Sequence, residues 1–75
     1  MGKNLLNINL IREMISAIKY DISNCIKALS DAKVDANNKH DSNAMIRLNG
    51  IESYMTRVLG YINNLENALR RGGIL

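Results

Sequence analysis

Few side chains in this 75-residue sequence have the chemistry of a catalytic or metal-binding site. Cys25 is the single cysteine, and no histidine lies within a helical turn of it to favour a reactive thiolate. His40 is the single histidine, and the residues around it do not supply the further ligands that a metal ion needs. The seven acidic residues are scattered along the chain. We therefore expect no catalytic residue, no metal site, no cofactor and no small-molecule substrate, and hence no enzyme.

The basic residues allow one alternative function. The formal net charge is +3, and acidic and basic residues alternate along the chain instead of forming blocks. Arg12, Lys19 and Lys33 share one stripe of a predicted helix, and Lys27 lies near it. Such a stripe can line phosphates, although charged stripes beside an apolar seam are usually the solvated side of a helix. A small regulatory dimer that binds RNA or DNA is the alternative, and we expect no nucleic-acid partner in the main interpretation.

Two tyrosines are the best candidates for contact with a partner. Tyr54, Tyr61 and Ala68 recur every seven residues and so share one side of a helix. Tyrosine buries a large ring at low entropic cost and keeps a hydroxyl group for the wet rim of an interface. The competing interpretation is that the rings pack on the flank of their own fold. The predicted partner interface comprises Tyr54, Met55, Leu59, Tyr61, Ile62 and Ala68.

Two heptad series of apolar or small residues identify the elements that must position these side chains. Alternating steps of three and four residues keep one seam of a helix apolar for about seven turns. The first series is Ile8, Ile11, Ile15, Ile18, Ile22, Cys25, Leu29 and Ala32. The second series is Ala44, Leu48, Ile51, Met55, Val58, Ile62, Leu65 and Leu69. In this arrangement Cys25 is expected to be buried as a small apolar residue.

The segment between the two series predicts an antiparallel hairpin. Polar residues replace the periodic apolar ones in 34–41, and Asp41 or Ser42 can cap a second helix. We expect helix one over about 4–33, the turn over 34–41, helix two over about 42–71 and a short tail at 72–75. Gly72 and Gly73 are suited to end the second helix. In the expected register Ile8 faces Leu69, Ile18 faces Val58 and Ala32 faces Ala44.

The expected fold class is an all-α, coiled-coil-like hairpin that forms a single domain. Two helices form a seam without an enclosed core, so we expect a homodimer or a partner protein to complete a bundle. The sequence has no apolar run of the ~20 residues that cross a bilayer and no signal-peptide core. A single cysteine is consistent with a reducing compartment, and we expect a cytoplasmic location.

The second helix carries the run Leu48-Asn-Gly-Ile-Glu-Ser-Tyr-Met-Thr-Arg-Val-Leu-Gly-Tyr-Ile62 after an Ile/Leu heptad helix and a polar turn. This arrangement resembles the small co-chaperones of type III secretion needle subunits. It is similar also to the needle subunits themselves and to the helical hairpins of the ESX (type VII) family, although the turn lacks the Trp-x-Gly of the latter and the Pro of the former.

The resemblance implies a chaperone-like accessory subunit of a bacterial secretion apparatus. In such a protein the hairpin joins a larger helical chaperone and helps to keep a filament subunit from polymerising early. A phage-type inhibitor that binds a host protein is a further alternative, because it would use the same kind of surface.

Overall fold

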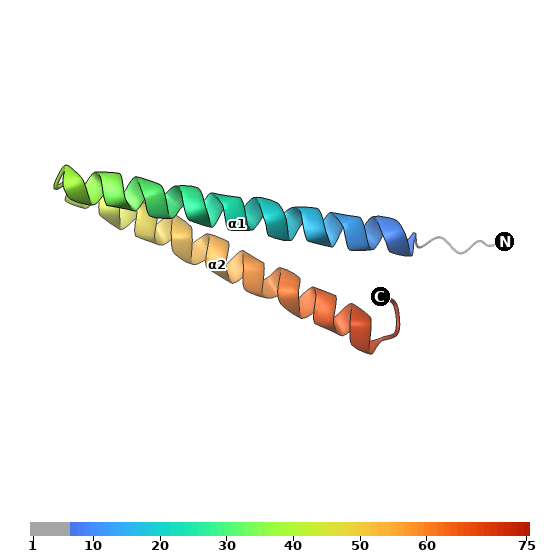
Figure 1. The fold of residues 1–75 in the computed structure, drawn as a ribbon. Helices are drawn as coiled ribbons and strands as arrows, with labels where there is room; N and C mark the ends of the chain where they lie inside the picture. Colours follow the sequence, from blue (N-terminus) through green and yellow to red (C-terminus); the bar gives the residue numbers. More distant parts are fainter. Residues whose placement is uncertain (1–6) are drawn as a thin grey trace.

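Capping residues set where the two helices begin. The computed structural model describes residues 7–75, in which α1 runs from Ile8 to Asn38 and α2 from Ser42 to Arg71 (Figure 1). The Asn7 side chain accepts a hydrogen bond from the backbone N–H of Leu10 at 3.0 Å. Asp41 does the same for the N–H of Ala44 at 3.0 Å. These bonds satisfy N–H groups that a helix start leaves without partners.

The all-α antiparallel hairpin predicted from the sequence is confirmed. The two helices have 31 and 30 residues and pack against each other in opposite directions. Of the two candidate caps for the second helix, the structure uses Asp41. The expected start of the first helix near residue 4 lies outside the described residues.

The turn is shorter than predicted. α1 continues to Asn38, five residues beyond the expected end at 33, and only residues 39–41 connect it to α2. Ala36 explains the extension, because it follows Leu29 by seven residues and is buried at 6 % exposure. An ion pair between Asp35 and Lys39 spans one turn of the same segment at 3.1 Å.

α1 ends in a Schellman motif built around a residue other than glycine. The N–H of His40 donates to the carbonyl of Asn37 at 3.1 Å, and the N–H of Asp41 donates to that of Ala36 at 2.9 Å. His40 adopts the left-handed region with φ 56°. Asp41 therefore closes α1 through its backbone and begins α2 through its side chain, which makes a three-residue turn possible.

α2 ends in a second Schellman motif, as its two glycines predicted. The N–H of Gly73, which has φ 76°, donates to the carbonyl of Arg70 at 3.0 Å. The N–H of Ile74 donates to the carbonyl of Leu69 at 2.9 Å. Ile74 and Leu75 are half-buried, and Figure 1 shows the chain end turning back from α2 toward α1.

The register differs from the predicted one. The expected register placed Ile18 opposite Val58, but the ammonium group of the adjacent Lys19 contacts Glu66, eight residues further along α2. The cause is the position of the turn, since extension of α1 to Asn38 moves the pivot of the hairpin. The facing residues shift by more than one helical turn as a result.

The seam between the helices is also rotated relative to the prediction. The row Ile15, Ile22 and Leu29 packs in the seam as expected, and so does the α2 row of Leu48, Met55, Ile62 and Leu69. The second row predicted on each helix is more exposed, and its most exposed members are Ile18, Cys25, Ile51, Val58 and Leu65. The row on the other side takes its place in the seam and comprises Lys19, Ile26, Lys33, Met45, Glu52, Leu59 and Glu66.

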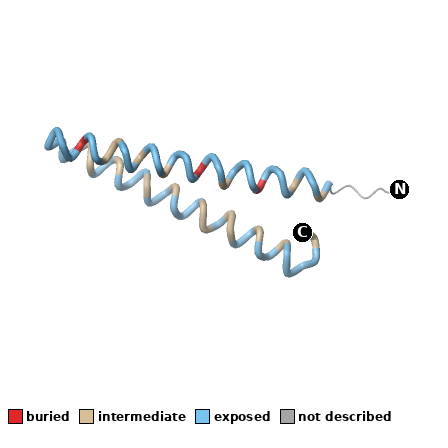
Figure 2. Tube along the Cα trace, viewed as in Figure 1, coloured by how far each residue is buried: buried red, intermediate tan, exposed pale blue. Residues whose placement is uncertain are grey.

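The resulting core is thin. Among residues 7–75 only Ile15, Ile22 and Ala36 are buried, at 5, 8 and 6 % exposure, and all three belong to α1 (Figure 2). The helices lie close together near the turn and diverge toward the chain ends (Figure 1). A domain of this size buries a smaller fraction of its unfolded surface than a larger domain does, so its stability is marginal.

We predict that His40→Gly stabilises the hairpin. A residue with a Cβ is strained at the left-handed φ of 56°, whereas glycine adopts it freely. The free energy of unfolding should rise by about 1 kcal/mol in chemical denaturation followed by circular dichroism. Lys39→Gly, at φ −92°, is the matched control and should give no gain. Equal effects of the two variants would contradict the proposed strain.

We predict that Gly60→Ala also stabilises α2. A Cβ at Gly60 would meet no atom of the described residues within 4 Å, so the better helix propensity of alanine should add about 1 kcal/mol. Gly73→Ala is the opposite control because Gly73 has φ 76°, and it should lower stability. Thermal unfolding of the two variants beside the wild type measures both effects.

Candidate interaction surface

One side of the seam carries ion pairs that join the two helices. Lys19 donates to Glu66 at 2.9 Å, and Lys33 donates to Glu52 at 2.8 Å. The two lysines are two heptads apart, and so are the two glutamates, so the pairs lie on one line along the hairpin. We call this side the polar face and define it by Lys19, Ser30, Lys33, Glu52 and Glu66.

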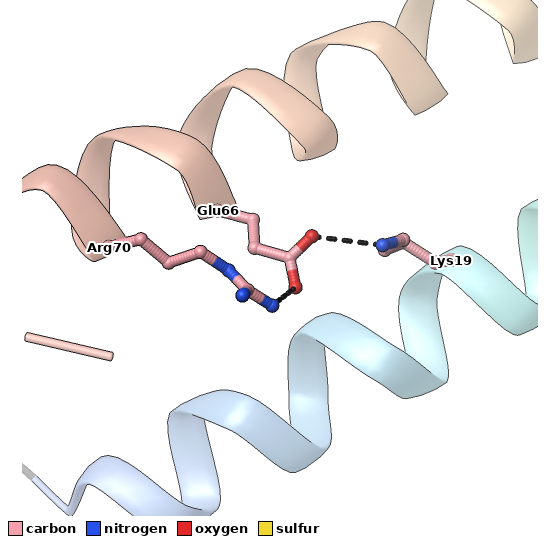
Figure 3. Close-up of polar contacts among 3 residues, drawn as sticks. All are labelled: Lys19, Glu66 and Arg70. Atoms are coloured by element: carbon pink, nitrogen blue, oxygen red, sulfur yellow. Dashed lines mark hydrogen bonds and ion pairs between the residues drawn. The ribbon is translucent and has the colours of Figure 1, made fainter.

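Glu66 is the most connected residue of the polar face. Figure 3 shows its carboxylate between the helices, where one oxygen accepts from Lys19 and the other accepts from Arg70 at 3.1 Å. The hydrogen bond from Lys19, followed by that from Arg70, lowers the pKa of Glu66 below 4.5. The hydrogen bond from Lys33 lowers the pKa of Glu52 in the same way, partly offset by desolvation. Both carboxylates are thus ionised partners in the hairpin at neutral pH.

The polar face changes the interpretation of the predicted nucleic-acid stripe. Lys19 and Lys33 are occupied in the cross-helix ion pairs. Arg12 belongs to the same row and is exposed, and Lys27 is exposed on another row of α1. The structure therefore does not present these four cations together as one open line toward a phosphate backbone.

The opposite side of the seam is apolar and open. Cys25, Ala28 and Leu29 of α1 line a shallow groove together with Ile51 and Met55 of α2. The exposed residues on this side continue the same heptad rows along both helices. We call this side the apolar face and define it by Met14, Ile18, Cys25, Ala28, Ile51, Tyr54, Val58, Tyr61 and Leu65.

The predicted partner interface divides between this face and the seam. Tyr54 and Tyr61 are each 61 % exposed, and Ala68 of the same row is exposed. The guanidinium group of Arg57 lies 5.6 Å from the ring centre of Tyr54. The other three predicted residues, Met55, Leu59 and Ile62, are half-buried in the seam, where α1 is their neighbour.

Sequence reasoning placed several apolar-face residues inside the hairpin. Cys25 was expected to be buried, but it is exposed. Ile51 and Leu65 were also assigned to the seam, and they are 45 and 48 % exposed. The reason is that a row of apolar residues in the sequence does not show which neighbouring helix covers it. The signal that was available is the opposite charge of the lysine row on α1 and the glutamate row on α2, which indicates the side of each helix that faces the other.

The remaining chemistry is limited. His40 lies exposed at the turn, where Ala36, Asp41, Met45 and Ile46 line a shallow depression with it. Within residues 7–75, no three His, Cys, Asp or Glu side chains are grouped so that they could hold a metal ion. Neither α1 nor α2 has a stretch long and apolar enough to cross a membrane.

We predict that acid weakens the hairpin through the polar face. The pKa values of Glu52 and Glu66 are lowered from 4.5 in the folded state, so the contribution of these carboxylates to stability is complete above pH 4.5. This stability is lost as the pH falls through the lowered pKa values of the folded state. The thermal midpoint of the wild type should therefore exceed that of Glu52→Gln/Glu66→Gln at neutral pH, and the two should converge in acid.

The lysine partners provide the control for this prediction. Lys19→Met/Lys33→Met removes both cross-helix ion pairs and leaves both carboxylates, so it should lose most of the same pH-dependent part of the stability, with the part from the Arg70–Glu66 pair retained. Added salt should reduce the difference as well, because these pairs are partly exposed. A difference between wild type and glutamine variant that persists below both pKa values would show that the ion pairs are not its cause.

Residues 7–75 thus form a two-sided hairpin, with cross-helix ion pairs on the polar face and exposed aliphatic and aromatic side chains on the apolar face. No family model matches the chain, and neither a curated protein nor a solved structure matches it.

Proposed function

We propose that the chain is a non-enzymatic protein–protein interaction module that buries its apolar face against helices of another protein molecule. The difference between the two faces carries this proposal. The polar face is satisfied within the hairpin by Lys19–Glu66 and Lys33–Glu52, whereas the apolar face exposes Ile51, Tyr54, Tyr61 and further side chains to solvent.

The energetics of the fold support the same proposal. Burial of apolar surface stabilises a protein by roughly 25 cal/mol for every Å² removed from water, and an exposed apolar residue does not contribute this free energy. Contiguous apolar patches on a protein surface are typical of interaction sites. The described hairpin has only three buried residues, so packing a second layer of helices on it would bury much more apolar surface.

The biological role that we propose for this contact follows the resemblance of the sequence to type III secretion co-chaperones. The chain would be a chaperone-like accessory subunit of a bacterial secretion apparatus, acting in the cytoplasm. Its apolar face would then add helices to a larger helical assembly. A phage-type inhibitor would use the same face on a host protein, and the identity of the bound molecule distinguishes the two roles.

We predict that Tyr61→Ala removes partner binding and leaves the helices in place. The Tyr61 ring is mostly exposed, so its loss should barely change the far-ultraviolet circular dichroism of the isolated chain. Truncation of an aromatic residue at the centre of an interface typically costs ~2 kcal/mol or more, which is about a 30-fold loss of affinity. Capture from the native host with mass spectrometry, followed by titration of the captured protein, measures this loss.

Thr56→Ala is the matched control, because Thr56 is exposed on the same helix but outside the apolar face. A protein retained by the wild type and by Thr56→Ala but lost with Tyr61→Ala supports the proposed function. Equal retention by all three baits would place the binding surface elsewhere.

A further inference from the structure

The apolar face has a charged edge on each helix, and the two edges have opposite sign. The edge of α1 carries three aspartates and no cation, while the edge of α2 carries three arginines and no acid. The acidic edge comprises the exposed residues Leu10, Met14, Ala17, Asp21, Asn24, Ala28, Asp31, Asp35 and Asn38. The basic edge comprises the exposed residues Asn43, Arg47, Gly50, Tyr54, Arg57, Tyr61, Asn64, Ala68 and Arg71.

These edges cannot neutralise each other within one hairpin. Each edge lies on the side of its helix that points away from the other helix, as the heptad positions require. The ion pairs between α1 and α2 all lie on the polar face, within the described residues. The structure therefore leaves an acidic and a basic border on either side of one apolar surface.

We infer that the apolar face binds a second copy of this chain, with α1 of each copy lying over α2 of the other. This inference rests on the proposed function and names the partner of the same face. A two-fold axis parallel to the helices produces this stack, and it brings the acidic edge of each copy onto the basic edge of the other. The product is an antiparallel four-helix bundle with both turns at one end.

The order of the residues along the two edges fits this stack. Because the helices run in opposite directions, the row Met14, Asp21, Ala28 and Asp35 meets the row Arg47, Tyr54, Tyr61 and Ala68 in reverse. Asp35 then meets Arg47, and Ala28 leaves room for the ring of Tyr54. Asp21 meets the hydroxyl group of Tyr61, and Met14 meets Ala68. This offset equals that of the Ser30–Glu52 hydrogen bond within the hairpin, and the longer side chains of Lys19 and Lys33 reach glutamates three positions further along α2.

The rows nearer the seam complete the second layer. Ile18 and Cys25 of α1 lie on the same side as Ile51, Val58 and Leu65 of α2, and the stack encloses all of them between the two copies. The face is roughly 45 Å long, and the Cα trace extends about 17 Å along its second principal axis. Its area is on the order of the ~800 Å² per partner that specific interfaces bury. The face is therefore of the size that a specific dimer uses.

Charge reversal at Asp35 and Arg47 tests the arrangement. Sedimentation equilibrium of the full chain at low ionic strength should give twice the chain mass of 8.4 kDa for the wild type. Asp35→Arg or Arg47→Asp alone places like charges at both symmetric contacts and should weaken the dimer by roughly 10-fold. The double variant Asp35→Arg/Arg47→Asp restores opposite charges and should return the dissociation constant to within about 3-fold of the wild type.

Two controls carry the same changes in net charge at another surface. Glu13→Arg and Lys27→Glu lie on an exposed row of α1 outside the apolar face and both edges, and should leave the dimer unchanged. The double variant also controls for the Asp35–Lys39 ion pair, because it lacks that pair and yet is expected to recover. Circular dichroism confirms that every variant remains helical.

Three results would overturn the inference. A wild-type chain that stays monomeric at all concentrations excludes the second copy, and capture of a different protein through Tyr61 would then leave the proposed function intact. Single reversals that dimerise as tightly as the wild type would exclude the paired edges. A double variant that binds no more tightly than the single variants would exclude a contact between Asp35 and Arg47.

Discussion

The line of ion pairs formed by Lys19 with Glu66 and Lys33 with Glu52 determines how the two helices face each other. Each helix has apolar residues on a wider strip than one neighbour can cover, so burial alone does not select a rotation about the helix axis. The lysine and glutamate rows attract each other and draw one side of that strip into the seam. Partly exposed pairs of this kind contribute little to stability. Their main effect is to fix how each helix is rotated about its axis. In that rotation the residues of the apolar face remain exposed.

The turn sets the second constraint, which is the register. Asp41 completes the Schellman motif of α1 and caps α2, so the connection needs only residues 39–41. A turn this short leaves little freedom for the helices to slide past each other. It also requires the left-handed conformation at His40. The pairing of Lys33 with Glu52 near the turn and of Lys19 with Glu66 further away is consistent with one rigid offset along the hairpin.

Periodicity in the sequence was sufficient to predict two antiparallel helices and the cap at Asp41, because these depend on local patterns. The turn position was not predictable in the same way, since 34–38 has few apolar residues and its helix depends on the burial of Ala36 and the Asp35–Lys39 ion pair. Tyr54 and Tyr61 lie outside the seam, whereas Met55 and Ile62, which the predicted interface combined with them, are half-buried in the seam. A heptad pattern identifies an apolar strip on each helix but not which rows of the strip face the other helix. In this hairpin the charged lysine and glutamate rows decide that orientation.

The same argument explains why Cys25 and Ile51 are exposed in a single chain although their sequence positions belong to a heptad core. The seam of this hairpin takes the row of Ile15 together with the row of Lys19, so the heptad row that includes Cys25 is left largely exposed on α1, as is the row of Ile51 on α2. The borders of this open surface are set by Asp21, Asp35, Arg47 and Arg57. Acidic residues on one border and basic residues on the other favour a partner with the reverse arrangement. A second hairpin turned over by a two-fold axis has this arrangement by symmetry, so one sequence can specify both the fold and the surface that completes it.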